Sequence, residues 1–184
     1  MMKLKMRTAL IAATLASAAG GVALAKNPMV GSAAMHSNKT IVQNAVNSKD
    51  HTTLVAAVKA ADLVGTLSGP GPFTVFAPTD KAFDKLPAGT VQTLVMPENK
   101  AMLTKVLTYH VVPGRMTSTQ IAAKIRAGRG MAHFTTVQGE RLMASMQGKS
   151  LVLTDAKGGK SRVTIADVMQ SNGVIHVVDT VLMP

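Results

Sequence analysis

The stretch Phe-Thr-Val-Phe-Ala-Pro-Thr-Asp-Lys-Ala-Phe at residues 73–83 predicts a strand that runs directly into a short helix. Phe73 and Phe76 are expected to point to opposite faces of the strand, because side chains alternate along it. The proline before Thr79 ends the strand ladder, and Thr79 stands where a helix N-cap belongs. Three of the four Phe residues of the chain lie here, so Phe73, Phe76 and Phe83 are expected to anchor the core.

Around this corner, the apolar pattern divides the chain into a helical first half and a strand-rich second half. Helical spacing predicts short helices that begin near Ile41, Asp50, Thr90 and Pro97, with Asp50 and Thr90 as caps, and another over 118–127. Later apolar runs, separated by glycine-containing turns, predict strands at 134–137, 141–145, 151–154, 162–165 and 174–178. Together with the early strand, this order predicts an α+β fold.

The end of the chain supplies a second distinctive block, Ser-Asn-Gly-Val-Ile-His-Val-Val-Asp-Thr-Val-Leu-Met-Pro at residues 171–184. With the first block and the pair Tyr109 and His110 between them, it resembles the signature of the fasciclin (FAS1) domain family. The resemblance is specific, because three blocks occur in order within one domain length. The positions of the two blocks that match the signature are Phe73, Phe76, Thr79, Asp80, Phe83, Asn172, Gly173, His176 and Asp179.

The resemblance implies a fold in which a two-sheet antiparallel β-wedge packs against a bundle of short α-helices. It also implies the function, because fasciclin domains are extracellular adhesion and interaction modules and not enzymes. The chain shows no internal repeat, so a single domain of the secreted type is expected where relatives carry tandem copies. Some single-domain relatives carry carotenoids, which leaves a carrier of an apolar small molecule, such as a carotenoid or lipid, as the alternative.

The first 25 residues have the composition of a cleaved signal peptide. A positive segment is followed by an apolar run over 8–19, and Ala23-Leu24-Ala25 is a small-residue cleavage motif. The apolar run is too short for a stable membrane span, and no other stretch approaches the roughly 20 apolar residues that a span needs. We therefore expect a secreted or periplasmic protein that is cleaved after Ala25, with a flexible leader over 26–39 and the fasciclin domain over 40–184.

The chain is strongly basic, with 20 Lys and Arg against 9 Asp and Glu. Removal of residues 1–25 takes away three basic residues and no acidic ones, which leaves a net charge of +8. This balance favours anionic partners such as an acidic glycan, an acidic cell-surface protein or the surface of a membrane. Nucleic acid is not expected as a partner, because export separates the protein from it and aromatic stacking platforms are few.

Four basic residues lie in or beside one predicted helix: Arg115, Lys124, Arg126 and Arg129. They are candidates for a site that binds acidic glycans or lipid headgroups through charge-assisted hydrogen bonds. The competing interpretation is an ordinary solvated face that keeps the protein soluble.

The family resemblance points to two further interaction candidates. The segment around Tyr109 and His110 is implicated in adhesion in the family, and so is an Asp-Ile pair before the second block, for which this chain has Asp167 and Val168. For His110 and His176, which lie inside apolar runs, the favoured interpretation is a partly buried imidazole bonded to backbone or hydroxyl groups. Asp167 is similarly interpreted as a turn or helix cap, with adhesion as the alternative.

The sequence does not support catalysis or a cofactor. No two His have the spacing of a zinc-peptidase helix, no nucleophile elbow occurs, and both Gly-Lys-Ser triplets lack the first glycine of a phosphate loop. Because the chain has no Cys, the soft metal ligands are Met and His, as at Met143, Met146 or Met131 near His133. Strand alternation would place Met143 and Met146 on opposite faces, so gap-filling is the favoured role and no metal site is expected.

Overall fold

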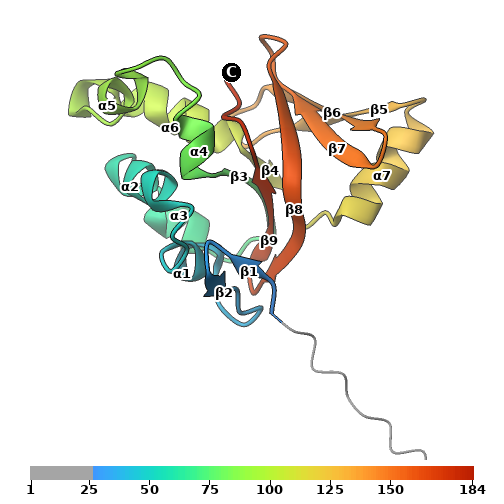
Figure 1. Ribbon diagram of the computed structural model, residues 1–184, viewed down its shortest axis with the longest axis horizontal. Helices are drawn as coiled ribbons and strands as arrows, with labels where there is room; N and C mark the ends of the chain where they lie inside the picture. Colours follow the sequence, from blue (N-terminus) through green and yellow to red (C-terminus); the bar gives the residue numbers. More distant parts are fainter. Residues whose placement is uncertain (1–26) are drawn as a thin grey trace, which may run out of the picture.

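The computed structural model describes residues 27–184, and the predicted signal peptide lies outside this range. Figure 1 shows the helices of residues 41–109 gathered on one side of a long bent sheet, with the helix of residues 118–127 on the other side. The helices are α1 (Ile41–Ala45), α2 (Thr52–Ala60), α3 (Val64–Ser68), α4 (Asp80–Phe83), α5 (Thr90–Leu94), α6 (Lys100–Tyr109) and α7 (Ser118–Ala127), with a 3-10 turn at Pro97–Asn99. None of the helices within 27–184 is long and apolar enough to cross a membrane.

The strands form a small ribbon and a large sheet. They are β1 (Met29–Val30), β2 (Ala33–Ala34), β3 (Phe73–Pro78), β4 (Val111–Pro113), β5 (Met131–Thr135), β6 (Arg141–Gln147), β7 (Ser150–Thr154), β8 (Lys160–Gln170) and β9 (Gly173–Val178). β1 pairs with β2, and the other seven strands follow the order β4-β3-β9-β8-β7-β6-β5. The predicted α+β class is therefore confirmed.

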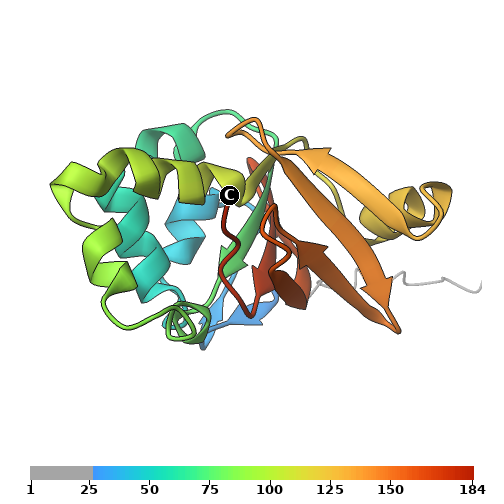
Figure 2. The ribbon, with the colours of Figure 1, turned by 90° about the horizontal axis from the view of Figure 1, so that it is seen from above.

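The long strand β8 joins two limbs of the sheet. It pairs with β7 over Lys160–Arg162 and with β9 from Val163 onward. Irregularities between Val163 and Val168 interrupt the second pairing, and bulges of this kind bend a strand. Seen from above in Figure 2, the two limbs diverge as a wedge. One pair departs from the predicted antiparallel arrangement, because β3 and β9 run parallel.

Two hydrophobic cores lie on opposite faces of the β3–β9 pair. On one face, Val75, Ala77, Ile175 and Val177 pack against the first six helices. On the other face, Phe76 packs with α7 and the inner faces of β5, β6 and β7, between the limbs of the wedge. The alternation expected for residues 73–77 is thus confirmed. Successive side chains of β3 enter two different cores.

Local capping agrees with the prediction at one helix and differs at two. Thr79 caps α4 by accepting a hydrogen bond from the Ala82 amide. His51, and not Asp50, occupies the N-cap position of α2, and its side chain makes no capping bond. Thr90 lies inside α5, because Gly89 takes the N-cap position with a left-handed backbone.

Residues 27–39 correct the prediction of a flexible leader. They form the β1–β2 ribbon, which the Lys49 amide joins to the domain through the Gly31 carbonyl at 3.1 Å. Val30 and Met35 are buried in the helix-side core. Sequence pattern missed this packing because two separated apolar residues in a small, polar segment produce no periodicity.

Gly173 is required where β9 meets β3. A Cβ atom at this position would lie 2.2 Å from the Phe73 carbonyl oxygen, closer than any real contact. We expect Gly173→Ala to lower the free energy of unfolding by about 3 kcal/mol, because the two strands would have to separate. Urea denaturation would measure the change.

Gly65→Ala in α3 is the matched control, because a Cβ there meets nothing within 4 Å. Alanine favours a helix over glycine by up to about 1 kcal/mol, so this variant is expected to be as stable as the parent or more so. Equal stability of the two variants would contradict the close strand approach.

Candidate functional site

Tyr109, the last residue of α6, is fully buried and hydrogen-bonds to two other segments. Its hydroxyl donates to the Arg141 carbonyl at 2.8 Å and accepts from the Ala156 amide at 3.0 Å. Burial raises the pKa of Tyr109, so the phenol stays protonated and keeps its donor. This hydroxyl links α6 to β6 and to the β7–β8 turn, and no partner can reach it in this structure.

His110 follows directly and links the end of α6 to the C-terminal segment. Its Nδ1 donates to the Val106 carbonyl at 2.7 Å, and its Nε2 accepts from the Leu182 amide at 3.0 Å. These two bonds together require the neutral tautomer that carries its proton on Nδ1. Burial lowers the pKa of His110 to about 4, so the ring remains neutral at ordinary pH and secures the C-terminal segment.

His176 on β9 has a similar role. Its Nε2 donates to the Met116 carbonyl at 2.8 Å, its Nδ1 accepts from the Asp167 amide at 3.3 Å, and its ring stacks on Phe76. Burial is the main cause that lowers the pKa of His176. The ring therefore connects β9 to the segment before α7 and to the bulge of β8.

Asp167 lies in that bulge with a left-handed backbone at φ 59°. Its carboxylate accepts from the Ser118 amide at 2.6 Å and also from the Ser118 hydroxyl. An acidic group at the first residue of α7 satisfies an orphan amide and suits the positive end of the helix. The neighbouring Val168 is fully buried in the helix-side core, so its side chain is not available to a partner.

Asp80 of the first block caps a helix far from its own position in the sequence. Its carboxylate accepts from the backbone amides of Thr52 and Thr53 and from the Thr52 hydroxyl, at 2.7–3.2 Å. Burial alone would raise the pKa of Asp80, but these hydrogen bonds outweigh it and the pKa lies below its ordinary value. Asp80 thus supplies the cap of α2 that the sequence predicted for Asp50.

Asn172 is the corresponding clamp in the second block. Its side-chain oxygen accepts from the Ile41 amide at 3.0 Å, and its nitrogen donates to the carbonyls of Leu67 and Gly69. One amide group thereby joins the start of α1, the end of α3 and the turn before β9. The function of this residue is structural.

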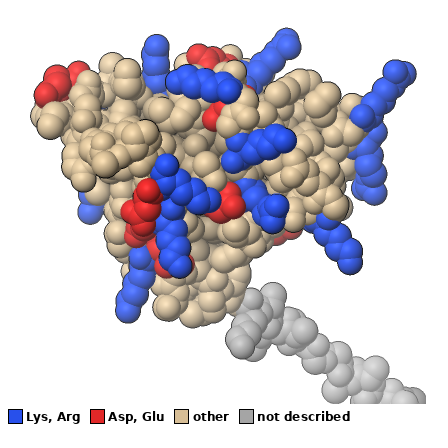
Figure 3. All heavy atoms as spheres, turned by 45° about the horizontal axis from the view of Figure 1, so that its top comes forward, with Lys and Arg blue, Asp and Glu red and all other residues tan. Residues whose placement is uncertain are grey.

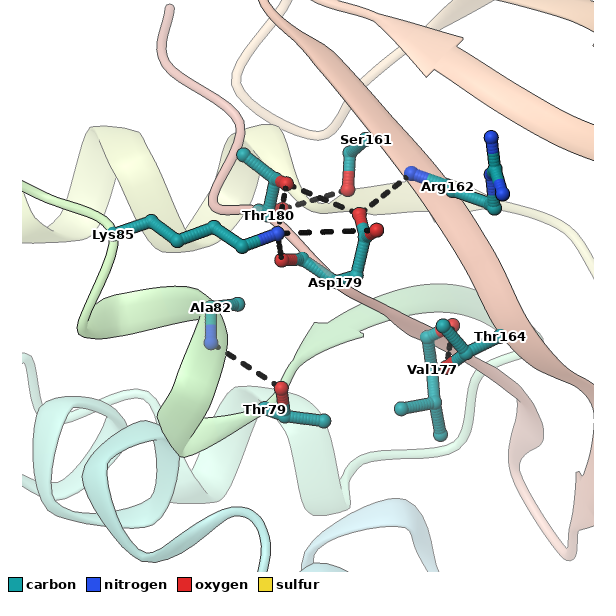
Figure 4. Close-up of polar contacts among 9 residues, drawn as sticks. All are labelled: Thr79, Ala82, Lys85, Ser161, Arg162, Thr164, Val177, Asp179 and Thr180. Atoms are coloured by element: carbon teal, nitrogen blue, oxygen red, sulfur yellow. Dashed lines mark hydrogen bonds and ion pairs between the residues drawn. The ribbon is translucent and has the colours of Figure 1, made fainter.

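Asp179 is the last signature position of the second block, and its side chain is partly exposed. Figure 4 shows its polar contacts. Asp179 accepts from the Arg162 amide at 2.9 Å and lies 3.8 Å from the Lys85 ammonium, whose main hydrogen bond at 2.6 Å goes to the Asp179 carbonyl. Both side chains of the ion pair are about half exposed, so the pair contributes little stability. The backbone bonds fix the exit of β9 against β8.

The predicted basic cluster separates into two parts. Arg115 donates to the carbonyls of Gln170 and Ser171 at 3.0 Å, which ties the segment before α7 to the β8–β9 turn. The other three residues form what we call the α7 basic patch: Lys124, Arg126 and Arg129. They are exposed in the last turn of α7 and just after it, and within residues 27–184 none of them forms a salt bridge.

Asp155 is a buried acid that the sequence analysis did not single out. One carboxylate oxygen accepts from the amides of Lys157 and Gly159, and the other accepts from the Met183 amide. It shapes the β7–β8 turn and holds the C-terminal segment beside it. The signal that could have found it is local, because Asp ahead of a Gly-Gly turn commonly bonds backbone amides two to four residues on.

An apolar cavity of about 160 Å³ lies between the helices and the sheet. Its walls come from α1, α2, α3, α6 and the helix-side face of β3 and β9, and they are almost entirely aliphatic. Val46, Val55 and Lys59 are among the lining residues, and Val46 and Lys59 are exposed. A site of this kind can hold an apolar group of about the size of benzene.

A sequence profile of the Fasciclin domain matches residues 49–184. The chain belongs to the fasciclin domain family. This fasciclin domain is 48% identical over 163 residues to Protein sll1483 of Synechocystis sp., covering 86% of this chain and 81% of that protein. It is 39% identical over 131 residues to pig transforming growth factor-beta-induced protein ig-h3, covering 71% of this chain but 17% of the longer protein.

The fold comparison agrees with the sequence. The structure superposes on a FAS1 domain pair from the insect cell adhesion molecule fasciclin I with a TM-score of 0.70, covering 79% of this chain and 51% of that one. The sequence identity is 19%, so this likeness establishes the fold. The predicted FAS1 fold is confirmed, and the two signature blocks supply the neighbouring strands β3 and β9.

The buried histidines are expected to make the stability of the fasciclin domain depend on pH. His110 has a pKa of about 4 when folded and an ordinary value of 6.5 when unfolded, so only the unfolded chain gains a proton between these values. Stability is therefore expected to fall as the pH falls from 6.5 to 4, by about 3 kcal/mol from this residue. His51 and His176, whose pKa values are also lowered mainly by burial, act in the same direction.

The measurement is the free energy of urea unfolding at pH 7 and at pH 4.5. His110→Asn is expected to reduce the difference between the two values, even though it lowers both. His133→Asn is the matched control, because His133 is exposed on β5. The same pH difference in His110→Asn as in the parent would show that His110 is not the group responsible.

Proposed function

We propose that this protein is an exported, non-catalytic interaction module that recognises an anionic partner on a cell surface or in a matrix. Membership of the fasciclin family supports an adhesive role, and the signal peptide predicted at residues 1–25 supports export. The observation that carries the anionic partner is the α7 basic patch, which is exposed and has no acidic neighbour within ion-pair distance among residues 27–184.

The distribution of charge supports this surface as the point of contact. In Figure 3, Lys and Arg side chains are spread across the face shown, and some of them project from the end that carries α7 and β5 in Figure 1. The guanidinium groups of Arg126 and Arg129 are suited to bidentate hydrogen bonds with carboxylate or sulfate groups. An acidic glycan presents such groups in a repeating array, which matches several exposed cations better than a single charge.

The signature residues support this assignment by their positions. Tyr109, His110 and Val168 are buried, and Asp167 already bonds Ser118. A partner that contacted these residues directly would have to expose buried side chains or replace the hydrogen bond between Asp167 and Ser118. We therefore assign them to the scaffold and assign recognition to the exposed surface of α7.

The test is the binding of heparin, used as a defined acidic glycan, at 0.1 M salt. We expect the triple variant Lys124→Gln, Arg126→Gln, Arg129→Gln to bind about tenfold more weakly, because each exposed ion pair contributes roughly 0.5 kcal/mol. Binding by the parent is also expected to fall steeply with added salt, since exposed charges are screened within about 10 Å at 0.1 M.

The control variant removes the same charge elsewhere: Lys49→Gln, Lys81→Gln, Lys105→Gln. These residues are exposed on the helical side of the molecule. Equal losses in both triple variants would show that net charge alone attracts the glycan. Binding that does not depend on salt would contradict the electrostatic mechanism.

The second candidate function is that of a carrier for an apolar molecule, and the aliphatic cavity favours it. Its volume of about 160 Å³ is below the 300–1,000 Å³ of typical drug-sized sites, so it would take a small ligand or one end of a longer one. Lys59, in the last turn of α2, could pair with an anionic headgroup outside the cavity.

Purification from the native source tests the carrier function. A carrier is expected to yield about one apolar molecule per chain by mass spectrometry of an organic extract. Val55→Phe, which would fill part of the cavity, should reduce that yield while leaving heparin binding unchanged. A ligand-free extract from the parent protein would exclude the carrier and would leave the glycan test unaffected.

A further inference from the structure

The outer face of the β5–β6 hairpin brings together three soft metal ligands. His133 on β5 lies directly opposite Met143 on β6, and Met131 lies two residues before His133 on the same face. The inner residues between them, Ala132 and Phe134, are buried in the wedge core, so the outer residues face away from it. Met131 is 53% exposed, His133 is exposed and Met143 is half-buried.

The strand register sets the spacing of these side chains. Residues directly opposite in an antiparallel pair have Cβ atoms about 5 Å apart, and diagonal neighbours are about 7 to 8 Å apart. His133 and Met143 form the direct pair, whereas Met131 is diagonal to Met143 because it pairs with Ser145. Methionine has three rotatable bonds before its terminal methyl group, so both thioethers can turn toward the imidazole without any change in the backbone.

We propose that Met131, His133 and Met143 form a surface site for Cu(I). Thioether sulfur selects this soft cation, and imidazole nitrogen is also a good copper ligand. The three residues supply two sulfurs and one nitrogen from a single hairpin. This site goes beyond the proposed adhesive function and does not depend on it.

The surroundings favour a soft monovalent ion over a hard divalent one. By register, the charged strand residues on the same outer face are Arg141, Lys160 and Arg162, and all three are basic. None of the strand residues on the outer face of β5, β6 and β7 is a carboxylate, so oxygen-seeking cations lack their preferred ligand there. Repulsion from the basic residues is smaller for a single charge than for a double one.

The register also explains why the sequence predicted no metal site. Within the sequence, the nearest methionine to Met143 is Met146, and strand alternation places these two on opposite faces. The two ligands that share a face with Met143 come from the neighbouring strand, which a one-dimensional pattern does not reveal. Pairing of β5 with β6 is what creates the group.

The experiment uses the full chain, kept reduced and free of oxygen, in competition with the chromogenic Cu(I) chelator bicinchoninate. The parent is expected to withdraw Cu(I) from the chelator. The triple variant Met131→Leu, His133→Gln, Met143→Leu should lose one equivalent of bound copper. Met143→Leu alone should weaken binding at this site roughly tenfold or more, because even changes beyond the ligands cost 10- to 100-fold.

Met146→Leu is the matched control, because Met146 is an exposed methionine on the same strand but on the other face. It is expected to leave the copper affinity unchanged. Titration with Ag(I), followed by NMR of the methionine methyl groups, should shift the signals of Met131 and Met143 first. Thermal unfolding of each variant without metal verifies that the fold is intact.

Two results would show that no such site exists. One is a parent chain that fails to compete with the chelator, and the other is a triple variant that binds as much Cu(I) as the parent with the same affinity. A loss of copper in Met146→Leu equal to that in Met143→Leu would also contradict the proposal, because the site would then not lie on this face.

Discussion

The parallel pairing of β3 with β9 is the constraint on which the rest of this structure depends. It joins segments about a hundred residues apart in the sequence. The hydrogen bond from the Asn172 side chain to the Leu67 carbonyl, 105 residues away, brings together the same two parts of the chain. Closing so long a loop is entropically costly, and the pairing is stabilised because both of its faces are covered. One face carries the helix-side core, the other carries the wedge core, and Gly173 permits the close approach.

Buried polar groups connect the ends of these elements. Tyr109, His110, His176 and Asp155 each bond two or more backbone groups, and at least one of these lies in a distant segment. Each therefore fixes a turn or terminus that apolar packing alone would leave loose. The chain has no Cys, so an exported form would rely on such bonds where many secreted proteins use disulfides. Both histidines are expected to serve this role in the neutral form, because burial lowers the pKa of His110 and of His176.

In the function that we propose, scaffold and recognition occupy different parts of the molecule. The signature blocks lie mostly inside, where they set capping, strand pairing and close packing. The side chains that a partner could contact are exposed. Arg129 of the α7 basic patch is followed two residues later by Met131, the first residue of β5. The aliphatic cavity is lined by residues of α1, α2, α3 and α6. Figure 1 shows these helices on the opposite side of the sheet from α7, so binding in the cavity and binding at the α7–β5 end would involve separate surfaces.

The sequence by itself determined the features that arise within a few residues. The strand-to-helix corner at 73–83, its alternating faces, the Thr79 cap and α7 follow from periodicity and capping, which are local properties. Tertiary structure decided which distant segments meet. It made β9 the parallel partner of β3, gave α2 its cap from Asp80, packed residues 27–39 and placed His133 opposite Met143. Strand register and long-range helix caps depend on which loops close and on which faces become buried. A local sequence pattern encodes neither the register nor the long-range caps.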